Sequence, residues 1–247
     1  MLSSSQIGEL VKKYKISESV VIREYLQVLF LKELYEERYG RNIFFKGGTA
    51  IRLIFGGSRF SEDLDFTVEG SRKDFDDFIK VFFEKLEKLY NFSFKDRKSL
   101  VGMRYLLSYE KVFINLDFSF REKVLEPSKS IVTSDYPVVF RSFVHHLSGR
   151  EIVAEKIRAL LTREKGRDIY DLWFLLSKKM QIDKKMVEEK LKYYHLGKFE
   201  PKKVIDRIKK FEREKFVVDV RPFVPIGERE RLGEFFDYVV EFLESKI

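Results

Sequence analysis

The stretch that decides the fold is FFKGGTAIRLIFGGSRFSEDLDF, residues 44–66, which joins two predicted strands through a glycine turn and a short helix. We predict a strand at 43–45, a tight turn at Gly47 and Gly48, and a helix from Thr49 to Phe55. Glycines let a ligand approach the backbone, and the N–H groups at a helix start favour anions such as phosphate. Although most glycine pairs only make turns, this context predicts a triphosphate cradle.

Two aspartates one residue apart, Asp63 and Asp65, follow on the next predicted strand. Because strand side chains alternate, both carboxylates point to one face, and Leu64 and Phe66 point to the other. Neighbouring like charges raise each other's pKa unless a cation lies between them, and carboxylate oxygens suit Mg²⁺ or Mn²⁺. The pair therefore predicts a metal site.

A second pair with the same spacing, Asp74 and Asp76, lies in the first turns of a predicted amphipathic helix. Acidic residues near a helix start are favoured by the helix dipole and by capping. This pair therefore needs no metal, and we interpret it as structural.

A third acid, Asp117, lies in the predicted strand KVFINLDFSF, residues 111–120. Alternation places it on one face with Asn115, opposite Leu116 and Phe118. Asp117 is our candidate for the third ligand of a two-metal site. The alternative is an ordinary strand residue that faces solvent.

The rest of the chain shows two kinds of periodicity. We predict a helix over 17–39, strands over 43–45, 62–70, 91–96, 103–110, 111–120 and 138–144, and an amphipathic helix over 71–90. After residue 147 every periodic segment is helical, over 150–164, 167–178, 184–195, 201–215 and 228–246. The sequence therefore predicts an α+β protein, with a mixed β-sheet and flanking helices in residues 1–146 and a helical C-terminal domain in residues 147–247.

Composition excludes several classes of protein. The 247 residues have no cysteine, so disulfides are impossible, and no apolar run approaches the roughly 20 residues of a membrane helix. We therefore expect a cytoplasmic protein without membrane partners. The net charge of +8 fits a polyanionic partner, or alternatively a lysine- and glutamate-rich surface. Much of the positive excess lies between Pro201 and Lys215.

Four motifs in order, KGGTAIRL, RFSEDLDF, AEKIRALLTR and RDIYDLWFLL, resemble the AbiEii/AbiGii-type nucleotidyltransferase toxins of the polymerase-β-like nucleotidyltransferase superfamily. The resemblance covers residues 23–176. It implies a nucleotidyltransferase-like fold that uses Mg²⁺ or Mn²⁺ to transfer a nucleoside monophosphate from a nucleoside triphosphate to an acceptor hydroxyl. It also implies a toxin paired with an antitoxin protein, and an RNA acceptor such as the 3′ end of tRNA.

The resemblance also assigns residues. Gly47, Gly48 and Thr49 match the glycine-plus-hydroxyl turn of the family, with threonine in place of the more common serine. Asp63 and Asp65 match its metal-binding pair. Lys156 matches the lysine of the helical motif, and Asp168 or Asp171 the last acidic motif.

Each of the later residues has a structural alternative. Lys156 and Arg163, seven residues apart, share one helical stripe that could face phosphate, but Lys156 could equally be exposed to solvent. Asp168 and Asp171 could cap a helix after Gly166.

The loop before the acidic strand offers two further contacts. Arg59 and Ser61 could contact phosphate oxygens or metal-bound water, or could only stabilise the loop. As a whole, the sequence also allows a protein or small-molecule acceptor, or a non-catalytic RNA-binding protein on the same scaffold.

Overall fold

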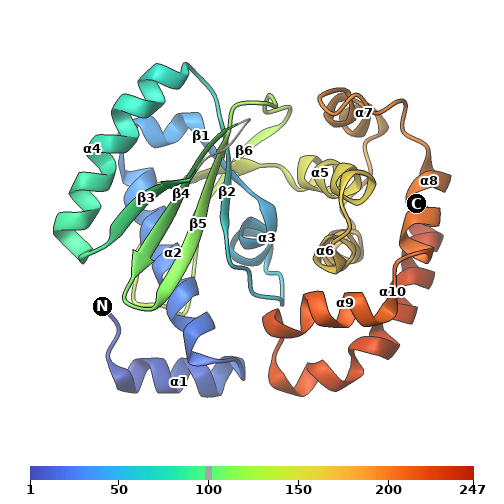
Figure 1. The fold of residues 1–247 in the computed structure, drawn as a ribbon, viewed down its shortest axis with the longest axis horizontal. Helices are drawn as coiled ribbons and strands as arrows, with labels where there is room; N and C mark the ends of the chain where they lie inside the picture. The colour runs from blue at the N-terminus through green and yellow to red at the C-terminus, as the bar shows by residue number, and fades with distance from the viewer. Residues whose placement is uncertain (98–101) are drawn as a thin grey trace. The chain divides into compact units, whose positions relative to one another are not determined.

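The chain divides into two compact units in the computed structural model, which describes residues 1–97 and 102–247 (Figure 1). The first unit comprises residues 1–56 and 60–147. The second comprises residues 57–59 and 148–247. Each unit buries apolar side chains of its own.

A mixed β-sheet forms the centre of the first unit, with seven strands among the residues described (Figure 1). The strand order is β3-β4-β5-β2-β1-β7-β6, in which β2 is parallel to β5 and β1 to β7, while the other neighbours are antiparallel. The strands are β1 (Ile43–Lys46), β2 (Leu64–Val68), β3 (Ser93–Arg97), β4 (Gly102–Tyr109), β5 (Val112–Ser119), β6 (Pro127–Ser130) and β7 (Val144–Leu147). The helical segments are α1 (Ser4–Tyr14), α2 (Glu18–Glu36), the 3-10 turn η1 (Arg38–Asn42), α3 (Gly47–Phe55) and α4 (Arg72–Tyr90).

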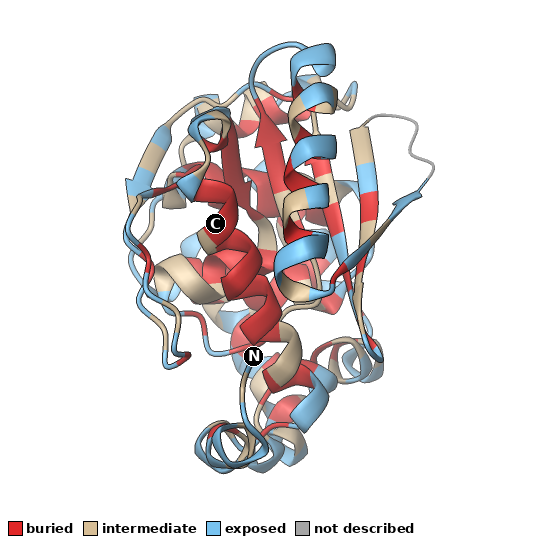
Figure 2. Cartoon of the chain, turned by 90° about the vertical axis from the view of Figure 1, so that its left-hand side faces the viewer, coloured by how far each residue is buried: buried red, intermediate tan, exposed pale blue. Residues whose placement is uncertain are grey.

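An aromatic core fixes which face of the sheet carries the acids. Phe66 of β2 stacks on Phe118 of β5 with ring centroids 4.9 Å apart. Phe30 of α2 packs on Phe66, and Phe75 of α4 packs on Phe118. Such ring pairs each add about 0.5–1.5 kcal/mol beyond burial of their area. Figure 2 shows α2 buried along most of its length and α4 with an exposed outer side. The opposite face of β2 and β5 is left for polar side chains.

The second unit is helical throughout its described elements. They are α5 (Gly149–Thr162), α6 (Gly166–Ser177), α7 (Lys184–Lys192), α8 (Pro201–Lys209), α9 (Arg213–Val220), the 3-10 turns η2 (Arg221–Phe223) and η3 (Ile226–Arg231), and α10 (Leu232–Lys246). Gly166 allows one close contact between these helices. A Cβ on Gly166 would lie 2.8 Å from the backbone of Phe216, so glycine lets α6 begin directly against α9.

The predicted α+β class, a mixed sheet followed by helices, is confirmed. Three local predictions are wrong. The strand predicted over 138–144 is instead β7, which begins at Val144 and contains both histidines. The helix predicted over 201–215 breaks between α8 and α9, where Phe211 turns into the core. The helix predicted to reach residue 195 ends at Lys192.

None of the helices in the described part of the chain combines the length and apolar composition needed to cross a membrane.

Candidate active site

The glycine turn brings the start of α3 against the acidic strand. The helix begins at Gly47, two residues earlier than predicted, and Gly47 has a φ of 78°. A Cβ at this position would lie 2.2 Å from Oδ2 of Asp65. The missing side chain therefore allows the carboxylate of Asp65 to approach the first turn of α3. The N–H groups of that turn have no partner within the helix.

The hydroxyl of Thr49 faces the acidic segment. Thr49 is buried, and its Oγ1 donates a hydrogen bond to the backbone carbonyl of Asp63. This bond fixes α3 to the residue that precedes β2. A contact between Thr49 and phosphate stays a prediction. Because the hydroxyl donates to Asp63, the backbone N–H of Thr49 is the donor left for that contact.

Four charged residues lie in register across four strands. Lys46 pairs with Asp65 across β1 and β2, Asp65 with Asp117 across β2 and β5, and Asp117 with Arg104 across β5 and β4. Residues directly opposite each other in a sheet share a face. We call Lys46, Asp65, Asp117 and Arg104 the charged row. Its order, cation, acid, acid, cation, relieves the repulsion between the two central carboxylates.

The carboxylate of Asp117 is held by the outer cation of the row. Arg104 donates from Nε, at 2.9 Å, and from Nη2 to Oδ2 of Asp117. The hydrogen bond and the charge of Asp117, followed by the charges of Asp65 and Asp63, raise the pKa of Arg104. Arg104 therefore lies in the field of all three acids. Asp63 has a different partner, because its Oδ1 accepts a hydrogen bond of 2.9 Å from Nδ2 of Asn115.

The donor set agrees only in part with the predicted metal site. Asp63 and Asp65 are half-buried carboxylates beside the α3 turn, which suits a hard divalent cation. Within residues 1–97 and 102–247, however, no three carboxylate or imidazole side chains lie close enough to hold an ion jointly. Asp117 as a third ligand stays a prediction, for which its Oδ1 is the oxygen that Arg104 does not bond.

A second charged cluster lies inside the helical unit. Nζ of Lys156 in α5 is 2.8 Å from Oδ1 of Asp168 and 2.7 Å from Oδ2 of Asp171, both in α6. All three side chains are buried. The interpretation of Lys156 as a solvent-exposed lysine is therefore wrong.

Two arginines complete this cluster. Arg59 donates from Nε and Nη2 to the two oxygens of Asp171, both at 2.6 Å, and is buried. Arg163, half-exposed, donates to Asp168 at 2.7 Å and 3.0 Å. We call Arg59, Lys156, Arg163, Asp168 and Asp171 the buried ion cluster. With three cations and two carboxylates, these five side chains carry one net positive charge.

The pKa values of the two acids follow from this geometry. Burial alone would raise the pKa of Asp168, but the charges of Lys156 and Arg163 outweigh it and lower that pKa. Burial also raises the pKa of Asp171, but the charges of Arg59 and Lys156 lower it by more, so the net effect is again a lowered pKa. Both carboxylates are therefore ionised at neutral pH.

The predicted capping role of Asp168 is wrong. Its carboxylate binds Lys156 and Arg163, whereas the N–H of Gly166 at the start of α6 donates to Oδ2 of Asp219 at 2.7 Å. Because Asp219 satisfies the helix start, Asp168 is available for the ion pairs. Asp168 and Asp171 both contact Lys156, so the geometry favours neither as the single acidic residue of the motif.

We expect Lys156→Met to lower the free energy of unfolding by about 3 kcal/mol or more, because Asp168 and Asp171 each lose a charge-assisted hydrogen bond inside the unit and keep only their arginine partners, Arg163 and Arg59. The matched control is Lys192→Met, which removes an exposed pair with Glu189 and should leave stability almost unchanged. Urea unfolding at pH 7 measures both. Equal losses in the two variants would show that the buried ion cluster does not stabilise the helical unit.

The same comparison has a defined pH dependence. The folded pKa values of Asp168 and Asp171 are lowered, so their stabilising contribution is present above the unfolded pKa of about 3.9 and is lost as the pH falls towards the folded values. The difference in stability between wild type and Lys156→Met should therefore shrink below about pH 4.

The predicted residues thus fall into two groups. The first unit brings together Gly47, Gly48, Thr49, Asp63, Asp65 and Asp117, and the second brings together Arg59, Lys156, Arg163, Asp168 and Asp171. Ser61, in the first unit, accepts a hydrogen bond at its backbone carbonyl from Gln27. A contact of Arg59 or Ser61 with phosphate stays a prediction.

Sequence reasoning missed Lys46 and Arg104. Arg104 could have been found from the two-residue turn Glu110-Lys111, because a hairpin closed there pairs Tyr109 with Val112 and therefore Arg104 with Asp117. Lys46 carried no such signal, since β1 and β2 are separated by α3.

A sequence profile of the nucleotidyl transferase AbiEii toxin family, described as a type IV toxin–antitoxin system, matches residues 29–238. The chain belongs to this family. It is therefore an AbiEii nucleotidyltransferase and the toxin type of a toxin–antitoxin system. A search of curated proteins finds no match.

Solved structures share the fold of this AbiEii protein. The nucleotidyltransferase toxin MenT4 from Mycobacterium tuberculosis is 18% identical, with a TM-score of 0.70 over 99% of this chain and 90% of MenT4. JHP933 from Helicobacter pylori is 20% identical, with a TM-score of 0.50 over 93% of this chain and 95% of that one. The similarity to MenT4 confirms the predicted nucleotidyltransferase-like fold.

Proposed function

We propose that this AbiEii nucleotidyltransferase binds a nucleoside triphosphate and Mg²⁺ or Mn²⁺, and transfers the nucleoside monophosphate to a hydroxyl of an RNA acceptor such as the 3′ end of tRNA. We further propose that it acts in the cytoplasm as a toxin controlled by a cognate antitoxin. The observation that carries the proposal is the position of the Asp65 carboxylate against the glycine start of α3. It supports the proposal because helix starts favour anions and carboxylate oxygens are the ligands that Mg²⁺ prefers.

Residues of the first unit would bind the triphosphate end of the substrate. The N–H groups of Gly47, Gly48 and Thr49 in the first turn of α3 would donate to phosphate oxygens. Asp63 and Asp65 would hold the divalent cation. When bound, that ion neutralises phosphate charge and lowers the pKa of the attacking hydroxyl.

The two cations of the charged row, Lys46 and Arg104, would act on the carboxylates instead of on the substrate. These cations flank the acids and offset the repulsion between the neighbouring carboxylates before the substrate arrives. Asp117 would join the metal site through Oδ1, because Arg104 bonds only to Oδ2.

Residues of the second unit would add positive charge. The buried ion cluster carries one net positive charge, and Arg163 keeps part of its guanidinium exposed. Lys156, Asp168 and Asp171 would act by holding Arg59 and Arg163 in fixed positions. Preorganised cations of this kind stabilise charge that develops during phosphoryl transfer.

The basic tract of the C-terminal helices gives only weak support for an RNA acceptor. Four of its cations are matched by acids of the same unit, in the pairs Lys203–Glu200, Lys209–Glu244, Arg213–Asp237 and Lys215–Glu164. Their field on RNA is therefore reduced.

A label-transfer assay tests the proposal. The protein would be incubated with Mg²⁺, total RNA and one of four α-labelled nucleoside triphosphates at a time. We expect label in RNA, with one nucleotide preferred, and no transfer once a chelator removes the metal. Label in protein or in a small molecule would identify another acceptor. RNA binding without any transfer would indicate a non-catalytic protein.

A further inference from the structure

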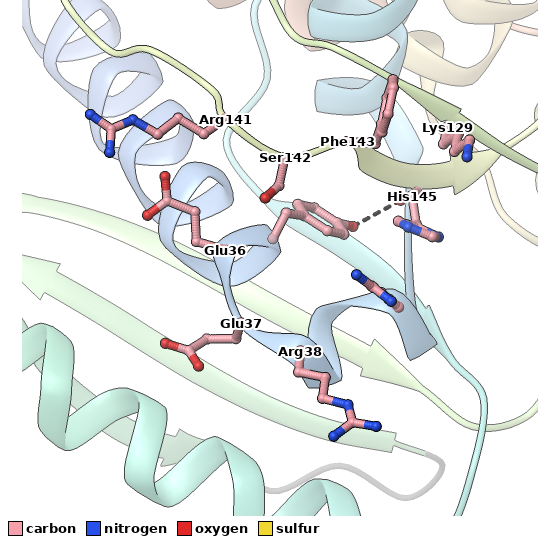
Figure 3. Close-up of a pocket in the computed structure, with 10 residues that line it drawn as sticks. Glu36, Glu37, Arg38, Lys129, Arg141, Ser142, Phe143 and His145 are labelled. Carbon is pink, nitrogen blue, oxygen red and sulfur yellow. Dashed lines mark hydrogen bonds between the residues drawn. The ribbon is translucent and has the colours of Figure 1, made fainter.

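A pocket of about 490 Å³ lies at the end of β1 away from the glycine turn, within the first unit (Figure 3). It is lined by residues from the end of α2, from η1, and from the β6–β7 region. Pockets of this volume are large enough for a small organic ligand. None of the predicted active-site residues lines it.

Four exposed cations line this pocket: Arg38, Arg41, Lys129 and Arg141. None of them forms an ion pair with a carboxylate in the part of the chain that the structure describes. The two acids of the lining bond to cations outside the pocket, Glu36 to Lys32 at 3.1 Å and Glu37 to Lys85 at 2.8 Å, and both lysines also bond to Glu33. With four cations and two acids in its lining, the pocket carries a net positive charge, in contrast to the paired cations of the C-terminal helices.

Aromatic rings form a second feature of the same pocket. The rings of Tyr35 and His145 are stacked, 6.3 Å apart at 14°. The hydroxyl of Tyr35 donates to the carbonyl of Ile43 at 3.0 Å and to that of His145 at 2.8 Å, so this wall is fixed to β1 and β7. Burial and the charges of Lys129 and Arg41 lower the pKa of His145, which keeps its ring neutral at pH 7.

One ring is open to solvent. Phe143 is 49% exposed, and the ammonium group of Lys129 lies 4.9 Å from its ring centroid. Exposed aromatic rings beside cations are how proteins bind single-stranded nucleic acids, because bases stack on the rings while cations contact the backbone. In a duplex the faces of each base are covered by the neighbouring base pairs, so a duplex base cannot stack on a ring in this pocket.

We propose that this pocket binds single-stranded RNA, with one base stacked on Phe143 and the backbone phosphates contacted by the exposed cations of the lining, Arg38, Arg41 and Arg141. It is a second RNA contact, separated from the acids by the length of β1, roughly 10 Å for four residues. The inference rests on the proposed function only in naming RNA as the acceptor. It concerns binding, and needs no step of the transfer reaction.

The test measures binding of a 12-nucleotide, fluorescently labelled, single-stranded RNA by anisotropy at several salt concentrations. The variant Arg41→Ala/Arg141→Ala should bind about tenfold more weakly, and the slope of log affinity against log salt should become shallower by about 0.7 for each phosphate that is no longer neutralised. Phe143→Ala should weaken binding about fivefold or more without changing that slope.

The matched control is Lys73→Ala/Lys88→Ala, which removes the same charge from the exposed side of α4 in the same unit. This control should bind RNA nearly as wild type does. Equal weakening in the two double variants would overturn the proposal, because it would indicate general charge attraction. Wild-type affinity in the pocket variants would also overturn it.

Transfer activity separates this inference from the proposed function. Asp65→Asn should bind RNA with wild-type affinity while transfer is abolished. In Arg41→Ala/Arg141→Ala, a higher RNA concentration should restore the transfer rate, since the change raises KM and leaves kcat unaltered. If wild type labels no RNA but the pocket variants still bind RNA more weakly, the proposed acceptor is wrong and the pocket assignment stands.

Discussion

Asp65→Asn should reduce nucleotidyl transfer by about 100-fold or more, the scale on which removing one preorganised electrostatic group slows a reaction. The asparagine keeps the size of the side chain but removes the charge that holds the metal. Asp63→Asn should have an effect of similar size, because Asp63 supplies the other carboxylate of the pair. Initial rates with labelled nucleoside triphosphate and saturating RNA measure both variants.

The chain offers a matched control in the second Asp-x-Asp pair. Asp76 lies on the exposed side of α4 and pairs with Lys80 at 2.6 Å. Asp76→Asn should therefore retain the wild-type rate. Wild-type turnover in both Asp63→Asn and Asp65→Asn would refute the assignment of the acids, and an equally slow Asp76→Asn would indicate a general effect of charge.

Gly47→Ala should also abolish transfer, through geometry instead of charge. The added Cβ would lie 2.2 Å from Oδ2 of Asp65, so either the carboxylate or the start of α3 must shift. The left-handed φ of Gly47 adds about 1–2 kcal/mol of backbone strain. Transfer rates and thermal unfolding of the same preparation measure the two effects.

Gly56→Ala separates the clash from the strain. Gly56 ends α3 with a φ of 73°, close to that of Gly47, but a Cβ there has no neighbour within 4 Å. Both variants should unfold at a lower temperature, and only Gly47→Ala should fail to transfer. If both fail equally, backbone strain in α3 explains the result, and close approach of Asp65 to the turn does not matter.

Alternation predicted the acidic face well, because its physical basis is local. The period of two along β2 and β5 placed Asp65 and Asp117 opposite their buried apolar neighbours, and the aromatic core confirms that face. The polar run Pro127–Ser130 gave no such signal. It forms the edge strand β6, where one side is unpaired and no apolar residue is required.

The charged row could not be predicted in full, because it depends on pairing between distant strands. The sequence analysis treated Asp63 and Asp65 as two carboxylates whose repulsion no neighbouring side chain offsets. In the sheet, Lys46 and Arg104 flank the central acids of the row. Repulsion alone is therefore a weaker argument for metal binding than the sequence suggested. The close approach of Asp65 to the α3 turn is the stronger argument.

The buried ion cluster shows a similar limit. Helical spacing placed Lys156 and Arg163 on one stripe, and both do contact Asp168. Burial of the cluster follows from packing of α5 on α6, which periodicity within one helix does not reveal. The contact of Arg59 with Asp171 joins residues 112 positions apart in the sequence.

The most direct test of the central claim is Mn²⁺ binding, followed by electron paramagnetic resonance of the free ion in the presence of a nonhydrolysable nucleoside triphosphate analogue. Wild type and Asp76→Asn should both bind Mn²⁺ together with the analogue. With Asp63→Asn/Asp65→Asn, Mn²⁺ should be bound only as strongly as it is by the analogue without protein. Equal Mn²⁺ binding by wild type and Asp63→Asn/Asp65→Asn would contradict the claim that these two carboxylates hold the metal beside the glycine turn.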